Sequence, residues 1–356
     1  MKKVAVVSIQ GVPAQYGGFE SLVENLIGEH KSPDVEYTVF CSSKDMPQKL
    51  ETYKGAKLKY IPLHANGVQS IFYDIIALIC SMRKYDVILN LGNSAPIFWI
   101  YKKLCKGKLI INIDGLSQFR DKYNKFTQKY IALLKHNETH YADIIVSDNK
   151  AIQDYVLKEY KKVSSLIAYG GDHVLRDISI ECQTETLKKY NLQKDGYAVA
   201  VCRIEPENNC HLVLEAFANT DSQLVYIGNW NRSEYGRALR HKYSNYTNIK
   251  ILDPIYDLDI LYTLRNNAKL YVHGHKVGGT NPSLVEAMFF GKPIACFDVT
   301  YNRETTNHKA LYFSDVDELK SIVEEASLSG GTELLEFAQQ HYTWKHIIKQ
   351  YEALYY

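Results

Sequence analysis

Short apolar runs alternate with amphipathic segments along almost the whole chain, and this alternation limits the fold more than any other feature. Residues 4–9, 87–89 and 109–112 are apolar enough for buried strands, and helical spacing of apolar residues follows each of them. A second series of the same kind begins at residues 197–201. Strands that alternate with helices form parallel sheets, which bind ligands at the carboxyl ends of their strands. The sequence therefore predicts an α/β fold with two doubly wound, Rossmann-like domains.

The length of 356 residues fits two domains better than one core. We expect an N-terminal domain over residues 1–168 and a second domain over residues 169–340. Residues 167–172 form the link between them, a strand that ends in a glycine hinge. Helical spacing predicts a further helix over residues 341–356. The hydrophobic content of 46% is that of a globular protein, and the net charge of +2 argues against a nucleic-acid partner.

The cysteines indicate a reducing compartment. There are seven of them, an odd number, and no two have the C-x-x-C spacing of a metal site. The N-terminus lacks the longer apolar region of a signal peptide, and the most apolar later segment, residues 71–80, contains Asp74. We therefore expect a cytoplasmic protein. The cysteines are Cys41, Cys80, Cys105, Cys182, Cys202, Cys210 and Cys296.

One stretch in the second half has the pattern of an anion site. An apolar run at residues 268–272 leads into a glycine-rich turn at 273–281, and then Asn281 or Ser283 caps a helix. The free amides and the dipole at such a helix start attract phosphate groups. Glu286, about one turn inside the helix, can reach a neutral polar group such as a ribose hydroxyl pair. An ordinary strand-to-helix connection is the alternative.

The first strand has a similar continuation. Residues 4–9 lead into a loop with Gly17 and Gly18, and a helix follows. The loop is not G-x-G-x-x-G, and no acidic residue follows at dinucleotide spacing, so a nicotinamide site is a weak interpretation. A plain tight turn is the alternative to a phosphate-binding loop.

An arginine follows the first strand of the second series. Arg203 lies two residues after the run at residues 197–201, and its planar guanidinium matches the oxygens of a diphosphate. A structural ion pair with Glu205 or Glu207 is the alternative, because surface ion pairs are common.

These motifs together resemble retaining GT-B glycosyltransferases, whose donor motif has two glutamates seven residues apart, the second followed by Ala-Met and Gly-x-Pro. Glu286 matches the second glutamate, and Gly291 and Pro293 match the trailing residues, whereas Gly278 stands in place of the first glutamate. The form of residues 278–284 is similar to bacterial rhamnosyltransferases of capsule and exopolysaccharide synthesis. The resemblance implies the GT-B architecture, in which two Rossmann-like domains face a cleft.

The resemblance also implies a donor site in the second domain and the glycine loop of the first. Asn208 stands where the general family has a lysine, so phosphate neutralisation depends on Arg203 and helix starts. Catalytic roles are implied for Arg203, Asp114 and Gly279. The implied donor-binding residues are Gly17, Gly18, Arg203, Asn208, Gly278, Gly279, Thr280, Asn281, Ser283, Leu284 and Glu286.

An acceptor loop is implied at residues 114–120. The resembled branch reads Asp-Gly-Leu-Glu-Trp-x-Arg, and here Ser117 and Gln118 replace the Glu and Trp, which suggests a different acceptor. The implied acceptor-side residues are Asp114, Gly115 and Arg120.

The resemblance implies an enzyme that transfers a hexose, L-rhamnose from dTDP-L-rhamnose, to a lipid-linked or oligosaccharide acceptor with retention of configuration. Amides of residues 281–284 and Arg203 would stabilise the departing diphosphate, whose oxygen would take the acceptor proton. We expect no cofactor and no metal, because no Asp-x-Asp motif stands in a suitable loop. A sugar-nucleotide epimerase, or a nucleotide-sugar or glycan-binding protein without turnover, are the alternatives.

A basic, aromatic segment lies in the first domain. Its lysines and arginine alternate with Phe119, Tyr123, Phe126, Tyr130 and Leu133. Such a face can lie on anionic lipid headgroups, so we expect peripheral contact with the inner face of the membrane. A solvated helix face is the alternative. The basic residues are Lys102, Lys103, Arg120, Lys122, Lys125 and Lys129.

Overall fold

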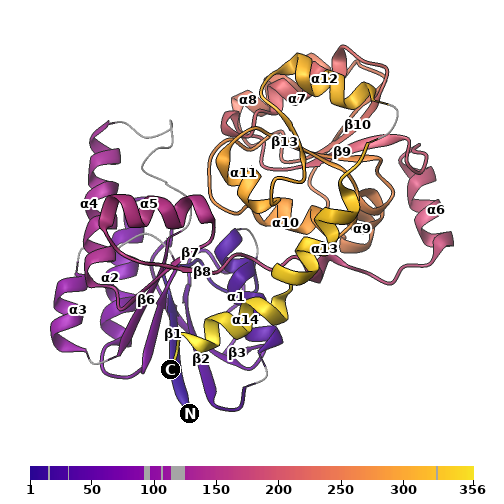
Figure 1. Cartoon of the computed structure of the whole chain (residues 1–356). Helices are drawn as coiled ribbons and strands as arrows, with labels where there is room; N and C mark the ends of the chain where they lie inside the picture. The colour runs from indigo at the N-terminus through magenta and orange to yellow at the C-terminus, as the bar shows by residue number, and fades with distance from the viewer. Residues whose placement is uncertain (15–16, 31, 92–96, 106, 114–124, 326–327) are drawn as a thin grey trace. The chain divides into compact units, whose positions relative to one another are not determined.

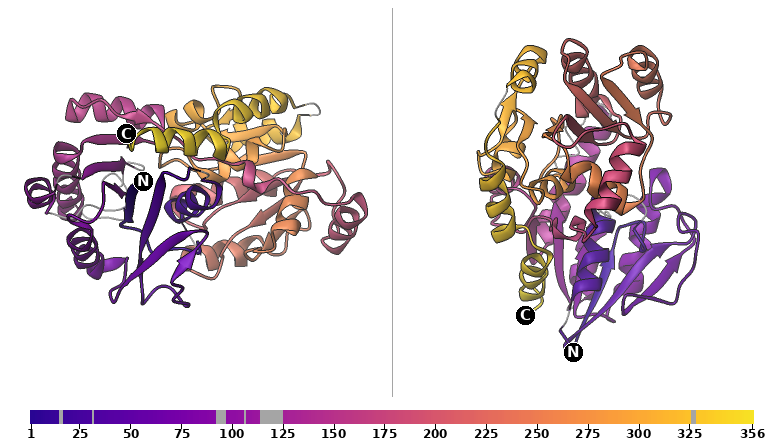
Figure 2. Two further views of the ribbon diagram at one scale, coloured as in Figure 1. Left: turned by 90° about the horizontal axis from the view of Figure 1, so that it is seen from below. Right: turned by 90° about the vertical axis from the view of Figure 1, so that its right-hand side faces the viewer.

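The computed structural model describes residues 1–356 except 15–16, 31, 92–96, 106, 114–124 and 326–327 (Figure 1). The chain divides into two compact units. Unit 1 contains residues 1–169 together with 344–356, and unit 2 contains residues 170–343. Within each unit, helices cover both faces of a sheet whose main strands are parallel (Figures 1 and 2).

The sheet of unit 1 has the strand order β3-β4-β2-β1-β5-β6-β7-β8, and its one antiparallel pair is β3 with β4. Its central strands are apolar on both faces because helices cover both; Val4, Val6 and Val7 are fully buried. The strands are β1 (Lys2–Val7), β2 (Val35–Ser42), β3 (Thr52–Tyr53), β4 (Ala56–Ile61), β5 (Val87–Asn90), β6 (Lys108–Ile113), β7 (Ile144–Ser147) and β8 (Ser165–Leu166).

The helices of unit 1 include one from the end of the chain. Trp344, Ile347, Ile348 and Tyr351 are spaced along one helix face and belong to the same buried core as β1 and α1. Tyr351 also accepts a hydrogen bond of 2.6 Å from Asn112 of β6. The helices are α1 (Gly18–Glu29), α2 (Ser70–Ser81), α3 (Phe98–Leu104), α4 (Lys125–Tyr141), α5 (Lys150–Tyr160) and α14 (Trp344–Ala353), with a 3₁₀ turn at Gly67–Gln69.

Unit 2 has a parallel sheet in the order β11-β10-β9-β12-β13-β14. Its strands are β9 (Tyr197–Val201), β10 (Gln223–Ile227), β11 (Ile249–Leu252), β12 (Leu270–His273), β13 (Ile294–Phe297) and β14 (Leu311–Phe313). Its helices are α6 (Ile180–Lys189), α7 (Cys210–Ala218), α8 (Glu234–Tyr243), α9 (Leu258–Asn266), α10 (Pro282–Met288), α11 (Thr300–Thr305), α12 (Val316–Glu324) and α13 (Gly331–His341), with 3₁₀ turns at Asp172–Val174 and Pro206–Asn208.

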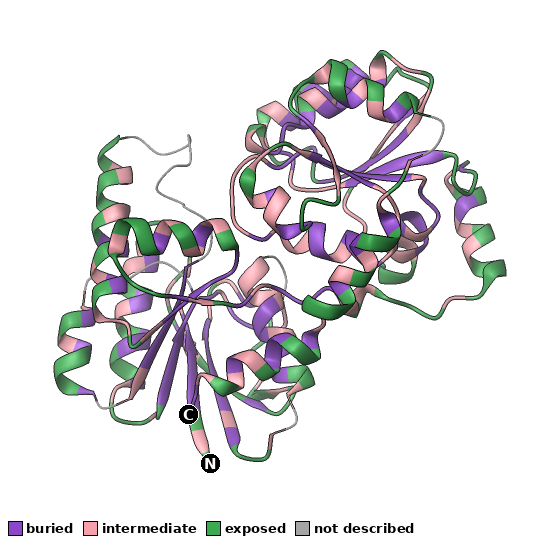
Figure 3. Ribbon diagram, in the orientation of Figure 1, coloured by how far each residue is buried: buried purple, intermediate pink, exposed green. Residues whose placement is uncertain are grey.

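The parallel strands of each sheet reverse their order once, and this reversal decides where a ligand can bind. In unit 1 the order reverses between β1 and β5, and in unit 2 between β9 and β12. At such a point the connections from the two adjacent strands lead to opposite faces of the sheet, so a crevice opens at the carboxyl ends of these strands. The strands that form these edges are buried, whereas the outer faces of the helices are exposed (Figure 3).

Candidate functional site

The reversal point of unit 2 brings together two of the predicted loops. Arg203 lies two residues beyond the end of β9, and the neighbouring strand β12 ends at His273. The loops that follow are joined by two hydrogen bonds: the Lys276 amide donates to the Glu207 carbonyl at 3.1 Å, and the Asn209 side chain donates to the Gly274 carbonyl at 3.0 Å. The structure thus places the arginine loop against the glycine-rich turn.

The close approach of these loops accounts for Gly274 and gives Asn208 a structural contact. A side chain at position 274 would bring its Cβ to 2.4 Å from the Asn208 carbonyl oxygen, so glycine is required. Asn208 is 1% exposed, and its side-chain amide donates to the Arg203 carbonyl at 2.8 Å. The Asn208 side-chain amide therefore stabilises the conformation of the arginine loop from a buried position.

Arg203 itself is half-buried. Among the residues that the structure describes, no carboxylate lies within ion-pair distance of its guanidinium, neither Glu205 nor Glu207. Within the described part of the chain, no side-chain carboxylate therefore neutralises the Arg203 charge, which can contact an anion at this edge of the sheet.

The turn before α10 has a backbone that favours glycine. Gly278 has a φ of +139°, while open space surrounds the position of a Cβ there. A glutamate at this position would therefore be strained by the backbone rather than by crowding. Glycine thus replaces the first glutamate of the resembled motif at a position whose backbone conformation residues with a side chain rarely adopt.

Asn281 caps α10. Its Oδ1 accepts from the Ser283 amide at 3.0 Å and from the Ser283 hydroxyl at 2.8 Å, and its carbonyl accepts from the Leu284 amide at 3.0 Å. The Ser283 and Leu284 amides are therefore engaged within the cap. The Leu284 side chain is fully buried, and Thr280 is 4% exposed.

Two histidines lie stacked at the end of β12. The rings of His273 and His275 are 4.2 Å apart and nearly parallel, and both residues are buried. Burial lowers the pKa of His273 to about 3, and burial, His273 and Arg203 together hold the pKa of His275 well below its ordinary value. Both rings are therefore neutral at physiological pH, beside the charge of Arg203.

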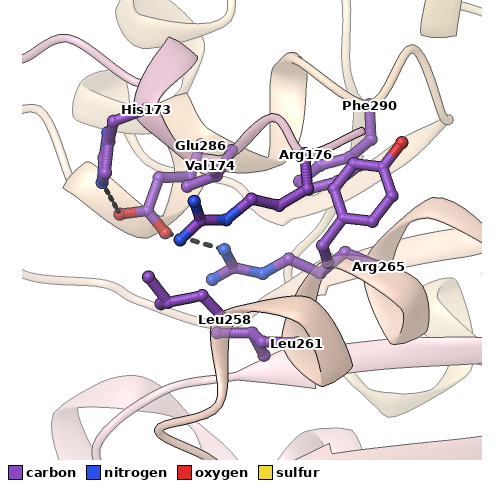
Figure 4. A pocket seen from close by; sticks show the side chains of 9 residues that line it. His173, Val174, Arg176, Leu258, Leu261, Arg265, Glu286 and Phe290 are labelled. Atoms are coloured by element: carbon purple, nitrogen blue, oxygen red, sulfur yellow. Dashed lines mark ion pairs between the residues drawn. The ribbon is translucent and has the colours of Figure 1, made fainter. Parts of the chain in front are cut away.

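Glu286 of α10 lines a pocket of about 130 Å³ between α9, α10 and the 3₁₀ turn at Asp172–Val174 (Figure 4). Its carboxylate lies 2.9 Å from Nη1 of Arg265 and 3.6 Å from Nε2 of His173. The walls combine apolar side chains with these charged groups. The lining residues are His173, Val174, Arg176, Leu258, Leu261, Tyr262, Arg265, Glu286 and Phe290.

Arg265 is the charged partner of Glu286. It is 4% exposed, and its Nε has no hydrogen-bond partner within the described chain. Burial lowers the pKa of His173, and the nearby Glu286 carboxylate partly opposes this shift. Sequence reasoning identified Glu286 but missed Arg265 and His173, which no local motif marks.

We expect Arg265→Met to lower the free energy of unfolding by about 2–4 kcal/mol, because the half-buried Glu286 carboxylate loses its charged partner. Urea unfolding of the full chain measures this change. Arg240→Met is the matched control: Arg240 pairs with Asp253 at the surface, and its loss is expected to cost less than about 1 kcal/mol. Equal losses in the two variants would show that the Glu286–Arg265 pair does not stabilise unit 2.

The glycine loop of unit 1 has a different constraint. Gly17 has a φ of +133° and precedes α1, and a Cβ on it would lie 2.0 Å from Oε2 of Glu20. The other carboxylate oxygen of Glu20 accepts from the Gln10 amide at 2.9 Å. The absence of a side chain at Gly17 therefore leaves space for the Glu20 carboxylate, which binds the Gln10 amide. Gly18 is the first residue of α1.

Sequence reasoning missed a buried polar group at the reversal point of unit 1. Ser8, with a φ of 68°, follows β1 and donates to Oδ1 of Asn90 at 2.8 Å. Asn90 is fully buried, and its Nδ2 has no partner within the described residues. Asp74 of α2 is 4% exposed and hydrogen-bonds to Ser8, and burial raises its pKa to about 8. Asp74 is therefore largely protonated at neutral pH.

The stability that Asp74 contributes depends on pH in a defined direction. Its pKa is raised in the folded state, so the contribution is complete below about pH 4 and is lost as the pH rises through about 8. We expect Asp74→Asn to flatten the fall in unfolding free energy between pH 5 and 9. The control Asp154→Asn, at an exposed position on α5, should follow the wild-type curve. A wild-type slope in Asp74→Asn would assign the pH dependence to other groups.

The predicted acceptor residues Asp114, Gly115 and Arg120 lie outside the described residues. Among the residues that are described, no three His, Cys, Asp or Glu side chains are grouped as metal ligands. Within the same part of the chain, no helix combines the length and apolar character needed to cross a bilayer.

Two family models match the chain, one in each half. Residues 1–172 match a domain of unknown function, DUF1972, and residues 183–336 match the family described as glycosyl transferases group 1. The second match contains the arginine loop, the glycine-rich turn and Glu286. No curated protein matches the chain in sequence.

Solved structures share the fold over the whole chain. A sucrose-phosphate synthase from Thermosynechococcus elongatus superimposes with a TM-score of 0.79 at 16% identity, covering 100% of this chain and 98% of that one. HepE from Anabaena, solved with UDP-glucose, gives 0.77 at 14% identity and covers 99% of both chains. MnaA from S. aureus, solved with UDP, gives 0.64 at 15% identity, covering 98% and 94%.

These matches confirm the predicted fold class, a two-domain α/β structure with the Rossmann-like parallel sheets of GT-B proteins. Together with the group 1 match over unit 2, the fold supports a GT-B glycosyltransferase.

Proposed function

We propose that this protein is a retaining glycosyltransferase that transfers L-rhamnose from dTDP-L-rhamnose to a lipid-linked or oligosaccharide acceptor in cell-surface polysaccharide synthesis. The observation that carries the proposal is the group 1 match over residues 183–336, which includes the reversal point of unit 2, Glu286 and Arg265. Relatives in fold solved with UDP and UDP-glucose support a nucleotide-sugar donor.

The two halves of the donor match two features of unit 2. The diphosphate lies at the carboxyl ends of β9 and β12, where Arg203 offers a charge with no carboxylate partner among the described residues. The nucleoside lies at the Glu286 pocket, where apolar walls take the base and the Glu286 carboxylate accepts hydrogen bonds from ribose hydroxyls. Arg265 holds that carboxylate in place at 2.9 Å.

In the proposed reaction, the bond between the sugar C1 and the diphosphate oxygen breaks, and the acceptor oxygen forms the new bond to C1 on the same face. The acceptor proton passes to the departing diphosphate oxygen, so charge and atoms balance without a separate base. Arg203 stabilises the negative charge that grows on the diphosphate as this bond breaks. His275 is buried near Arg203, and burial, His273 and Arg203 hold its pKa well below the ordinary value, so it does not add a positive charge to that of Arg203.

Gly278 stands where the resembled motif has its first glutamate, and with a φ of +139° this position offers no carboxylate to the donor sugar. We further propose that the protein is cytoplasmic and meets its lipid-linked acceptor at the inner face of the membrane.

Calorimetric titration of the full chain with dTDP-L-rhamnose, dTDP and UDP-glucose tests the identity of the donor. We expect dTDP-L-rhamnose to bind most tightly. Tighter binding of UDP-glucose would contradict the proposed base and sugar while leaving glycosyl transfer itself open to a direct assay.

A further inference from the structure

Three neighbouring helices of unit 1 expose large apolar side chains on their outer surfaces. On each helix these side chains recur three to five positions apart, which gathers them on one face. The exposed residues are Phe72 (59%), Ile76 (38%) and Ile79 (53%) on α2, Trp99 (45%) and Leu104 (47%) on α3, and Phe126 (82%), Tyr130 (37%) and Leu133 (64%) on α4. These residues, with the lysines of α3 and α4, are called the α2–α4 face below.

The three helices form one layer. They connect β4 to β5, β5 to β6 and β6 to β7, which all step the same way along the sheet, and right-handed crossovers therefore place them on the same side. Helices α3 and α4 pack against each other, and Arg83, just after α2, donates to the Leu104 carbonyl at the end of α3 at 3.3 Å. Figure 1 shows the helices together beside the sheet of unit 1. The exposed apolar side chains thus belong to one surface.

The charges on this surface have a single sign. The structure describes α2, α3 and α4 in full, and their only acidic residues, Asp74 and Glu138, are buried. Lys103, Lys125 and Lys129 are exposed, and Lys103 lies 5.4 Å from the Trp99 ring. Lys102 is paired with Asp143. Lysines among exposed aromatic and aliphatic side chains suit the boundary between lipid headgroups and acyl chains.

This charge pattern favours an anionic lipid layer over a second copy of the chain as the partner of the surface. A second copy of the chain would bring two cationic surfaces together, with no exposed carboxylate on these helices to compensate them. An anionic lipid layer supplies both the negative charge and the apolar environment. Exposed apolar side chains that gather on one surface mark contacts with a membrane or a partner.

We propose that the α2–α4 face is the surface by which this protein docks on an anionic lipid membrane. The inference rests on the proposed function, because a lipid-linked acceptor requires the enzyme at a bilayer. It changes the predicted basic cluster in two ways. Lys102 is paired with Asp143, and the apolar stripe of α2, which did not belong to the predicted basic cluster, joins the surface. Arg120 and Lys122 lie outside the described residues.

Flotation of the full chain with vesicles tests the proposal. We expect binding to vesicles of phosphatidylglycerol and phosphatidylcholine, little binding to phosphatidylcholine alone, and a steep decrease as salt rises from about 0.1 M to 1 M. The vesicles contain no saccharide and no donor, so the result does not depend on glycosyl transfer. Equal binding to both vesicle types would overturn the proposal.

Two variants locate the surface. We expect Lys125→Glu/Lys129→Glu and Phe72→Ser/Phe126→Ser each to lower partitioning onto anionic vesicles at least about tenfold. The matched controls are Lys188→Glu/Lys189→Glu on α6 and Val163→Ser, all at exposed positions outside the face, and they should bind as the wild type does. Thermal unfolding verifies that the variants fold. Equal losses in the controls would overturn the assignment of the surface.

Analytical ultracentrifugation measures whether the chain is a monomer or a dimer, and so tests whether a second copy covers the α2–α4 face. A monomer that floats with anionic vesicles supports docking on lipid. A stable dimer that Phe72→Ser/Phe126→Ser dissociates, without salt-sensitive vesicle binding, would instead identify the α2–α4 face as a contact between two copies. Vesicle binding without transfer activity would support the docking surface and refute the proposed function. Transfer to a water-soluble acceptor without vesicle binding would support glycosyl transfer and refute the docking surface.

Discussion

Glu286→Gln is expected to weaken the binding of the nucleotide-sugar donor by about 10- to 100-fold. Glutamine keeps the shape of the side chain but replaces a charged acceptor by a neutral one, and hydrogen bonds to a charged group are worth about 1.5–3 kcal/mol. The carboxylate lies in the pocket and is held by Arg265 at 2.9 Å, so a ribose meets it in a fixed orientation. Calorimetric titration with the donor measures the change.

The control for this variant is Glu304→Gln, which removes a carboxylate paired with His308 on the surface of the same unit. Donor affinity in that variant should equal the wild-type value. Thermal unfolding of Glu286→Gln accompanies the titration, because the substitution also removes the partner of buried Arg265. A folded variant that retains wild-type affinity would refute the ribose role of Glu286.

Arg203→Ala is expected to lower kcat by about 10²- to 10³-fold while it changes donor affinity much less. The charge on the departing diphosphate grows as the C1–O bond breaks, so a positive charge at the strand ends acts mainly on the transition state. Single-turnover rates and donor titration separate the two effects. The control Arg237→Ala removes an exposed arginine that donates to a loop carbonyl in unit 2.

Two outcomes would assign Arg203 another role. Equal losses in donor affinity and in kcat/KM would identify it as a clamp on the bound donor rather than on the departing group. Full activity would exclude it from the donor site, and the anion would then have to contact the turn at residues 278–281.

Much of the fold could be predicted from the sequence because strands that are buried on both faces of a sheet appear as continuous apolar runs. Val4, Val6 and Val7 are fully buried, which requires the continuous apolar run from which β1 was predicted. The apolar run at residues 197–201 likewise forms β9, Tyr197–Val201.

The candidate site was predictable only in part, because side-chain contacts join residues far apart in the sequence. Asn281 and Ser283 were both candidates for the cap of α10. The cap is Asn281, because its Oδ1 accepts from the Ser283 backbone amide, and Ser283 lies inside the helix. Arg265 belongs to another helix than Glu286, and no spacing rule links the two. The same holds for Asp74 and Ser8, whose contact depends on the position of α2 beside the end of β1.

Asn208 illustrates a different limit. A resemblance marked its position as a donor contact, but the side chain points into its own loop and donates to the Arg203 carbonyl at 2.8 Å. A motif assigns a position to a site, whereas the hydrogen bonds of the folded loop decide which of its atoms a ligand can reach.

Glycosyl transfer tests the account most directly. The purified chain is incubated with dTDP-L-rhamnose and a lipid-linked saccharide, and mass spectrometry and NMR follow the acceptor and the configuration at C1. We predict that the acceptor gains one deoxyhexose with retained configuration and that dTDP is released. Conversion of the donor sugar without transfer would identify an epimerase, and donor binding without any reaction would identify a binding protein; either result would contradict the proposed function.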